Sequence, residues 1–204
     1  MARIGGRSNW LAVPAGMLCA GVVVALVWLA LPMFPASVSW VGDTLRAATA
    51  PRAVPVAQET PAQLAAAGAI DCRTLYPDGL WSELTWRGGV LLSQSTAPPP
   101  TSVTSLTDAL TPTSRVTCNW RLRQGGGIVT TLAVVGPDAA TIADAALRGE
   151  GFRCSTTGGA LRCVRTRGDV VEDQRFRDGL WLSSVETSWR PERYGSRLAA
   201  EVWG

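Results

Sequence analysis

The chain has 204 residues, no His and a net charge of +3 that comes from 19 basic and 16 acidic side chains. Every basic residue is Arg, so the chain lacks both the commonest general base and metal ligand, His, and the lysine of Schiff-base and P-loop chemistry. These absences predict a chain that is not an enzyme and holds no cofactor or metal, and the small net charge predicts no nucleic-acid partner.

The first predicted element is a membrane-spanning helix at residues 10–34. Its centre, Leu11–Met33, contains no charged residue. At roughly 1.5 Å per residue it is long enough to cross a hydrocarbon core of about 30 Å. Trp10 and Trp40 flank it near the membrane interface. Cys19 lies in mid-span without the small preceding residue of a lipobox, so we interpret it as a small apolar residue and not an acylation site.

The charges around this span predict its orientation. Arg3 and Arg7 precede it without any acid, and Asp43 is the first acid after it. The positive-inside rule therefore predicts that residues 1–9 are cytoplasmic and that the C-terminal part is extracytoplasmic. A cleaved signal peptide is the alternative, but its apolar region is shorter, and the small-x-small site at residues 48–50 lies far from the span. We expect an uncleaved single-pass anchor in the cell membrane.

Residues 35–69 are predicted to form a stalk between the membrane and a folded domain. The first part is rich in Ala, Pro, Val and Thr and has no amphipathic period. Near its end a short helix is expected, because Thr60 is an N-cap residue, Pro61 suits the first helical position and Gln63 completes a capping box. Gly68 should end this helix.

An ordered collar that packs on a partner is the alternative for the first part of the stalk. Trp40, Val41 and Leu45 would be poorly placed in water there. The sequence leaves both interpretations open.

Residues 70–204 are predicted to form one extracytoplasmic domain. A second short helix is expected at Asp71–Leu75, ended by a turn at Tyr76-Pro77-Asp78-Gly79, where Pro fixes φ and Gly permits positive φ. A short strand, a loop and one or two helical turns should follow at Gly89–Gln94, Ala97–Pro100 and Ser105–Leu110.

A β-hairpin is the most regular part of the domain. In Val116–Leu122 the alternate residues are Val, Cys, Trp and Leu, which predicts a strand with one apolar face. Gly125–Gly127 turns the chain, and Ile128–Val135 is rich in β-branched residues. Residues 136–138 should begin a helix whose apolar face holds Ile142, Ala145, Ala146 and Leu147.

Further strands and a last helix complete the predicted domain. Phe152–Cys154 should pair with Leu161–Arg165, and Val170–Phe176 is another strand. After a turn at residues 177–179, Leu180–Trp189 alternates, with Trp181, Ser183, Val185, Thr187 and Trp189 on one side. Pro191 should begin the last helix, whose shared face holds Tyr194, Leu198 and Val202.

Four cysteines lie outside the predicted span: Cys72, Cys118, Cys154 and Cys163. An even number in an extracytoplasmic domain predicts two disulfides, for which three connectivities are possible. The turn residues between Cys154 and Cys163 favour that local pair, which leaves Cys72 and Cys118 for each other. A zinc site is disfavoured, because CxxC spacing and His are both missing.

Two groups of side chains are candidates for function. Asp169, Glu172 and Asp173 form an acidic cluster, which we interpret as a solvated strand edge because the EF-hand spacing is absent. The second group is a hypothetical ligand or partner face made of the tryptophans Trp86, Trp120, Trp181 and Trp189, with burial in the core as the commoner role of such residues.

One four-residue motif occurs twice in the sequence. Asp78–Trp81 and Asp178–Trp181 both read Asp-Gly-Leu-Trp. No wider periodicity supports a duplication. We interpret the two copies as independent Asp-Gly turns, each leading into a buried Trp.

Two short motifs point to a family. Ile70-Asp71-Cys72-x-x-Leu75 and Thr117-Cys118-Asn119-Trp120 resemble the Asp/Pro-Cys-x-x-Leu start and the Cys-x-Trp strand of small actinobacterial envelope proteins of unknown function. These are membrane-tethered domains, often lipoproteins, and the resemblance covers roughly residues 70–135. It implies a disulfide between Cys72 and Cys118. This chain differs by its membrane helix and its second cysteine pair, and the family has no activity to carry over.

The expected fold is α+β: one N-terminal transmembrane helix, then an antiparallel sheet of about five to seven strands with helices packed on one face. The expected function is that of a membrane-anchored, non-catalytic domain that binds a partner in the cell envelope, as an accessory subunit of a membrane complex. A ligand-binding or sensory domain with a Trp-lined face is the alternative. A pocket lined by Trp86 or Trp181 would favour the ligand class, and an exposed apolar patch on the membrane helix or stalk would favour the partner class.

Overall fold

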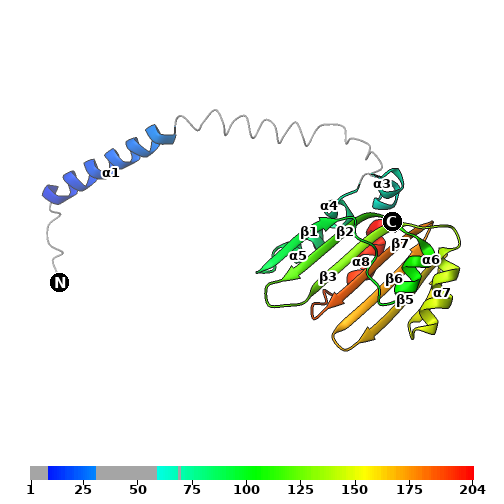
Figure 1. The fold of residues 1–204 in the computed structure, drawn as a ribbon. Helices are drawn as coiled ribbons and strands as arrows, with labels where there is room; N and C mark the ends of the chain where they lie inside the picture. Colours follow the sequence, from blue (N-terminus) through cyan, green and yellow to red (C-terminus); the bar gives the residue numbers. More distant parts are fainter. Residues whose placement is uncertain (1–8, 31–58, 69) are drawn as a thin grey trace, which may run out of the picture. The chain divides into compact units, whose positions relative to one another are not determined.

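The computed structural model describes residues 9–30, 59–68 and 70–204, which belong to two compact units, Met1–Val56 and Ala57–Gly204 (Figure 1). In the first unit α1, Asn9–Ala30, is a helix of 22 residues whose large apolar side chains after Gly16 are exposed. Across the described ranges, no helix is both long enough and apolar enough to cross a membrane. The end of the predicted span and most of the predicted stalk, residues 31–58, lie outside the described residues, so the span stays a prediction.

The predicted short helix is confirmed as α3, Pro61–Ala67. Thr60 and Gln63 form the capping box, with the Thr60 N–H donating to Gln63 Oε1 at 2.8 Å, and Gly68 ends the helix at φ +93°. Ala65 is fully buried in the core of the second unit. The helix that was assigned to the stalk is therefore part of the folded domain.

Seven strands form one antiparallel sheet in the order β1-β2-β3-β7-β6-β5-β4 (Figure 1). The strands are β1, Val90–Ser95; β2, Thr113–Leu122; β3, Gly127–Val134; β4, Arg153–Thr157; β5, Ala160–Arg167; β6, Val170–Arg177; and β7, Leu180–Thr187. The helices of the same unit after α3 are α4, Cys72–Leu75; α5, Asp78–Thr85; α6, Thr104–Leu110; α7, Ala139–Gly149; and α8, Tyr194–Trp203. The α+β class and the antiparallel sheet are confirmed.

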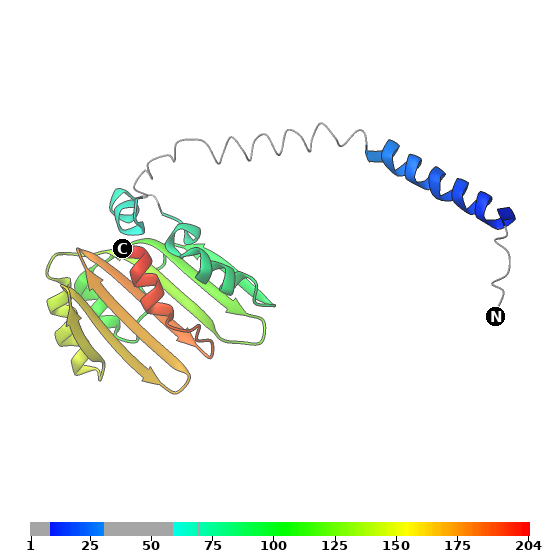
Figure 2. The same cartoon turned by 180° about the vertical axis from the view of Figure 1, so that it is seen from behind.

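Helices cover both faces of this sheet, not one as predicted. One core cluster joins α3, α4, α5 and α8 to the sheet, and a second joins α6 and α7 to it. Figure 2 shows α8 lying across the face that is hidden behind the strands in Figure 1. Successive residues of a strand point to opposite faces, so strands covered on both sides need apolar residues in both alternating sets. In β7 Leu182 belongs to the first cluster and Trp181 to the second.

Aromatic residues with a shared hydrogen-bond network build the first cluster. The hydroxyl groups of Tyr76 and Tyr194 are 2.9 Å apart, and Tyr194 also bonds Thr130 at 2.7 Å. The Trp120 indole donates to the Tyr76 hydroxyl at 3.0 Å. Each buried polar atom in this set has a partner, which removes the main cost of burying it. Burial raises the pKa of both tyrosines, so both remain neutral donors and acceptors.

The second cluster lies beneath a segment that we call the proline strap, residues 97–103. The strap leaves β1 at one edge of the sheet and leads to α6 near the other. The Pro100 carbonyl accepts from Gln174 Nε2 at 3.1 Å and from Ser183 Oγ at 2.5 Å. The Ser102 N–H donates to the Glu172 carboxylate at 2.9 Å. These buried polar residues of β6 and β7 thus hold the strap against the sheet.

The two Asp-Gly-Leu-Trp copies have different structures. Asp178 and Gly179 form the predicted turn before β7, with positive φ at both residues. Pro77 instead caps α5, and the Asp78 copy is the first turn of that helix, so the turn predicted there is wrong. A proline suits a helix start as well as a turn, and the apolar Leu80 and Leu84 of α5 select the helix by packing in the core. The difference gives no support to a duplication.

Two predicted side-chain orientations are also wrong. The buried face of α7 consists of Ala139, Ala143 and Leu147, spaced four residues apart, whereas Ile142 is 43% exposed. Trp189 does not continue the alternation of β7, because that strand ends at Thr187 and Ser188 has φ +55°. The chain turns there, and Trp189 packs in the first cluster.

Both predicted disulfides are present. Cys72 of α4 is bonded to Cys118 of β2 across a sequence separation of 46 residues, with both side chains buried. Cys154 and Cys163 are directly opposite each other in the β4–β5 hairpin, with a Cα–Cα distance of 4.0 Å. The long-range bridge ties the first helices to the sheet, while the short one closes an edge hairpin.

We predict that the long-range disulfide stabilises the domain more than the short one. In the chain-entropy model the Cys72–Cys118 loop is worth about 4 kcal/mol and the Cys154–Cys163 loop about 2–3 kcal/mol. The pair Cys72→Ala and Cys118→Ala should therefore lower the urea midpoint of the full chain in mild detergent more than the pair Cys154→Ala and Cys163→Ala. Equal midpoints for the two double variants, or the reverse order, would contradict this ranking.

Candidate functional site

The four tryptophans do not form one face. Trp120, Trp181 and Trp189 are buried, and Trp181 belongs to a different core cluster from the other two, on the opposite side of the sheet. Trp120 and Trp181 are strand residues of a sheet that is covered on both sides, and Trp189 packs in the first cluster beyond the end of β7. Trp86 alone of the four is exposed, at 88% of its surface. The Trp-lined face is therefore corrected to a single exposed residue at the end of α5.

The acidic cluster is not a solvated edge. Glu172 and Asp173 are buried on β6, which has a strand on each side. Glu172 pairs with Arg165 at 2.7 Å on the strap side. Asp173 lies on the other face and accepts from Arg162 and Arg175, each at 2.9 Å. Both carboxylates are thus occupied in structural ion pairs, and they form no shared carboxylate site. The third acid of the cluster, at position 169, is exposed in the turn before β6.

Glu186 is a buried carboxyl group that the sequence did not single out. It lies near the end of β7, on the face that α8 covers. Burial, and after it the negative charge of Asp173, raises the pKa of Glu186 from 4.5 to about 7, and Arg190 offsets part of this rise. α8 lies close to the face of the sheet that carries Asp173 and Glu186, because a Cβ at Gly195 would lie 2.5 Å from the Asp173 carboxylate.

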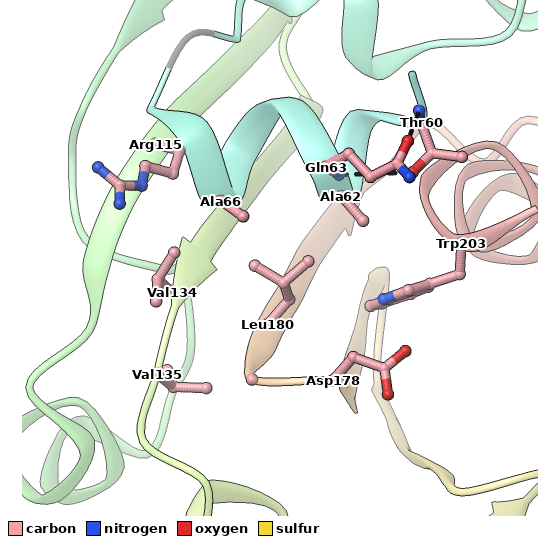
Figure 3. Close-up of a pocket in the computed structure, with 11 residues that line it drawn as sticks. Thr60, Ala62, Gln63, Ala66, Arg115, Val134, Val135, Asp178, Leu180 and Trp203 are labelled. Carbon is pink, nitrogen blue, oxygen red and sulfur yellow. Dashed lines mark hydrogen bonds between the residues drawn. The ribbon is translucent and has the colours of Figure 1, made fainter. Parts of the chain in front are cut away.

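A hollow of about 500 Å³ lies between α3, the end of α8 and the start of β7 (Figure 3). Its lining combines apolar residues such as Ala62 and Leu180 with the polar residues Thr60, Gln63, Arg115 and Asp178. Figure 3 shows the Trp203 ring reaching over it with the indole nitrogen turned toward Leu180, while the Arg115 guanidinium points away. The Trp203 Nε1 and Arg115 Nε atoms are buried without a hydrogen-bond partner among the described residues. The volume is that of a small-molecule pocket.

The most exposed apolar surface of the domain lies at the β1 end of the sheet. Exposed large apolar residues in the second unit are Trp86, Leu91, Leu92 and Ile142, and three of these four lie within seven positions. Leu91 is 59% exposed and Leu92 is 37% exposed. We call Trp86 together with β1 the apolar edge. Within the described residues no strand pairs with the outer side of β1, so its backbone donors and acceptors there are open.

The two edge strands of the sheet differ. The outer strand at the other end, β4, carries the charged Arg153, is tied down by the Cys154–Cys163 bridge and lies beside α7. β1 has the sequence VLLSQS, without charge, proline or bulge. Charge, proline and bulges are the devices that normally prevent edge-to-edge pairing. Their absence from β1 identifies it as the edge that is open to another strand.

A second hollow, of about 340 Å³, lies at the start of β1. We call it the glycine hollow; it is lined by Arg87, Gly88, Gly89, Leu122, Arg123 and Gln124. The Arg123 N–H donates to the Gly89 carbonyl at 3.0 Å, and Gly89 has φ +76°, so the loop is held in shape. The Arg87 guanidinium stacks on the Trp189 ring at 5.1 Å. Neither Arg87 nor Arg123 has an ion-pair partner among the described residues.

One group of described side chains has three potential metal ligands within reach of one another: Asp144, Cys154 and Cys163. The two sulfur atoms are joined in a disulfide and are not thiolates, so they are poor metal ligands. The short distances within this group are therefore explained by the disulfide between Cys154 and Cys163.

Comparison with known proteins gives no match to a family model, to a curated protein or to a solved structure.

We predict a pH dependence of stability from Glu186. Its pKa is higher in the folded protein than in the unfolded chain, so its contribution is fully present below about pH 4.5 and is lost as the pH rises through about 7. After allowance for solvent screening, the loss by pH 8 should be about 1–2 kcal/mol. Glu186→Gln should match the parent at pH 4 and be more stable than it at pH 8, measured by urea unfolding at both values. A parent that does not lose stability relative to the variant between these pH values would contradict the burial of a titrating carboxyl.

Proposed function

We propose that the protein is a single-pass membrane-anchored domain that faces the extracytoplasmic side, is not catalytic and binds a protein partner of the cell envelope through the apolar edge. The observation that carries this proposal is the exposure of Trp86, Leu91 and Leu92 at the strand β1, whose outer side has no partner strand among the described residues. Single exposed apolar groups are common, but several of them along a strand with open backbone groups are typical of an interaction site.

Three observations support the anchored location. Arg3 and Arg7 precede the apolar run. The exposed side chains of α1 between Met17 and Leu29 need a cover of lipid or protein. The domain contains two disulfides, which form and persist in oxidising compartments. The cytoplasmic N-terminus and the role of an accessory subunit of a membrane complex follow as parts of the same proposal.

A second candidate function is ligand binding in the 500 Å³ pocket of Figure 3. The observation that favours it is the unpaired indole N–H of Trp203, which a ligand oxygen would satisfy. The pocket is not lined by Trp86 or Trp181, so it differs from the ligand site that the sequence suggested. We place partner binding first, because it accounts for the exposed apolar residues of the apolar edge, which ligand binding in the pocket leaves unexplained.

The location is tested by the membrane behaviour of the full chain. We expect resistance to carbonate extraction, and we expect an external protease to reach the domain after residue 40 in intact cells. A control protein of the cytoplasm should stay protected in the same cells. Release of the domain into the medium with an N-terminus beyond Ala36 would show a cleaved signal peptide, and protection of the domain until lysis would reverse the orientation.

Partner binding is tested by photo-crosslinking in intact cells. Trp86→p-benzoylphenylalanine should give a discrete crosslinked product, because this side chain lies at the proposed contact. Ile142→p-benzoylphenylalanine is the matched control, since Ile142 is an exposed apolar residue on α7, in the other core cluster. Equal products from both positions, or none from Trp86, would refute the apolar edge as a partner site. In that case the Trp203 indole N–H signal, followed by NMR on addition of cell extract, would test the pocket.

A further inference from the structure

We propose that the partner supplies an extended apolar segment that pairs antiparallel with β1 and places a carboxylate at its C-terminal end in the glycine hollow. This inference rests on the proposed function and identifies the chemistry of the partner. The apolar edge and the glycine hollow are adjacent, because Arg87, Gly88 and Gly89 lead directly into Val90, the first residue of β1.

The backbone of β1 determines the mode of binding. Its inner side pairs with β2 over all six residues, from Val90 opposite Leu122 to Ser95 opposite Thr117. The outer side keeps a row of N–H and C=O groups for an incoming strand, which is how extended peptides add to a sheet. Leu91 and Leu92 point to opposite faces of the sheet, so the incoming segment needs apolar residues in both of its alternating sets.

The charges at the start of β1 determine the direction. Arg87 and Arg123 line the hollow, and Arg121 lies opposite Leu91 on β2. All three are exposed, and none has an acidic partner among the described residues. A strand antiparallel to β1 ends beside Val90, so a carboxylate at its C-terminal end reaches these guanidinium groups. In the parallel direction the same carboxylate would lie near Ser95, far from them.

The glycines make room for this carboxylate. Added Cβ atoms would meet nothing within 4 Å at Gly88 and only the Arg123 side chain at Gly89, so the hollow is open and its wall is that arginine. Arg87 is held by its stack on Trp189, which lowers the entropy lost when a ligand binds. Charge-assisted hydrogen bonds from two arginines are among the strong polar contacts available to a carboxylate.

A second copy of this chain does not fit the hollow. Antiparallel pairing of β1 with β1 of another copy would bring Ser95 and the neutral residues after it to the arginines. The arginines of both copies would then have no acidic partner in this pairing. The partner is therefore a different protein with a carboxylate where this chain has none.

The test begins with random octapeptides displayed as C-terminal fusions on phage and selected against the full chain in detergent. The best peptide is then made as the free acid, as the C-terminal amide and as the amide with an added terminal Glu. Fluorescence anisotropy measures the dissociation constant of each. We expect the amide to bind about tenfold or more weakly than the free acid, and the Glu form shows whether a side-chain carboxylate serves as well as a terminal one.

Variants of the protein locate the site. Arg123→Ala should weaken binding of the free acid about tenfold and leave the amide unchanged, and Leu91→Asp should weaken both. Arg153→Ala on the opposite edge strand is the matched control and should change neither. Retained near-ultraviolet circular dichroism shows that each variant is folded. No selected peptide, equal binding of acid and amide, or insensitivity to Arg123→Ala would overturn the inference.

The crosslinking experiment separates this inference from the proposed function. If the Trp86 product forms but no carboxylate-dependent peptide binding is found, the partner uses the apolar edge in another way and only the inference fails. If the Trp86 product is also absent, the proposed function fails with it.

Discussion

The hydrogen bonds of the proline strap are the constraint on which the arrangement of this domain depends. The chain leaves β1 at one edge of the sheet and must reach α6, which packs near the other. It does so across a buried face, and three consecutive prolines remove N–H groups that would otherwise need partners there. The remaining polar groups are satisfied from below, by Gln174 and Ser183 at the Pro100 carbonyl and by Glu172 at the Ser102 N–H. The strands that follow the strap pair on the inner side of β1 or farther into the sheet, so no strand of the described chain covers its outer side.

The same constraint accounts for the charges inside the sheet. A strand covered on both faces cannot keep acidic residues unless each has a partner, since an isolated buried carboxylate is costly. On β6, Glu172 meets Arg165 beneath the strap, and Asp173 meets Arg162 and Arg175 on the other face. Among the described residues Glu186 forms no ion pair of this kind, and burial raises its pKa to about 7. The paired acids Glu172 and Asp173 therefore stabilise the fold, and the unpaired Glu186 makes the stability of the fold depend on pH.

Local signals in the sequence predicted most of the elements, while properties set by distant residues were missed. Thr60, Pro61 and Gln63 define a helix start within four positions, and the alternation of Val116–Leu122 defines a strand without reference to anything else. The disulfide pairing followed from turn residues between Cys154 and Cys163. In contrast, the helical state of Asp78 and Gly79 depends on where Leu80 and Leu84 pack, and the burial of Glu172 depends on β6 being an interior strand. Neither property can be predicted from the neighbouring residues in the sequence alone. The candidate site does have a local signal in the sequence, an uncharged six-residue strand preceded by Arg-Gly-Gly.

An open edge of six residues is a weak binding site by itself, and the proposed membrane anchor would compensate for this low affinity. A short strand buries little surface, and part of the free energy gained is offset by ordering the incoming segment. When both proteins are held in one membrane, the second contact becomes effectively intramolecular, and modest affinity gives high occupancy. Trp86 and the two leucines would supply the apolar contact, and the arginines of the glycine hollow would supply direction. An edge of this kind would be an aggregation hazard in a concentrated soluble protein. On the proposed single-pass anchor the hazard is reduced, because stalk and membrane restrict how two copies can approach, and the edge can stay free of the charges that protect β4.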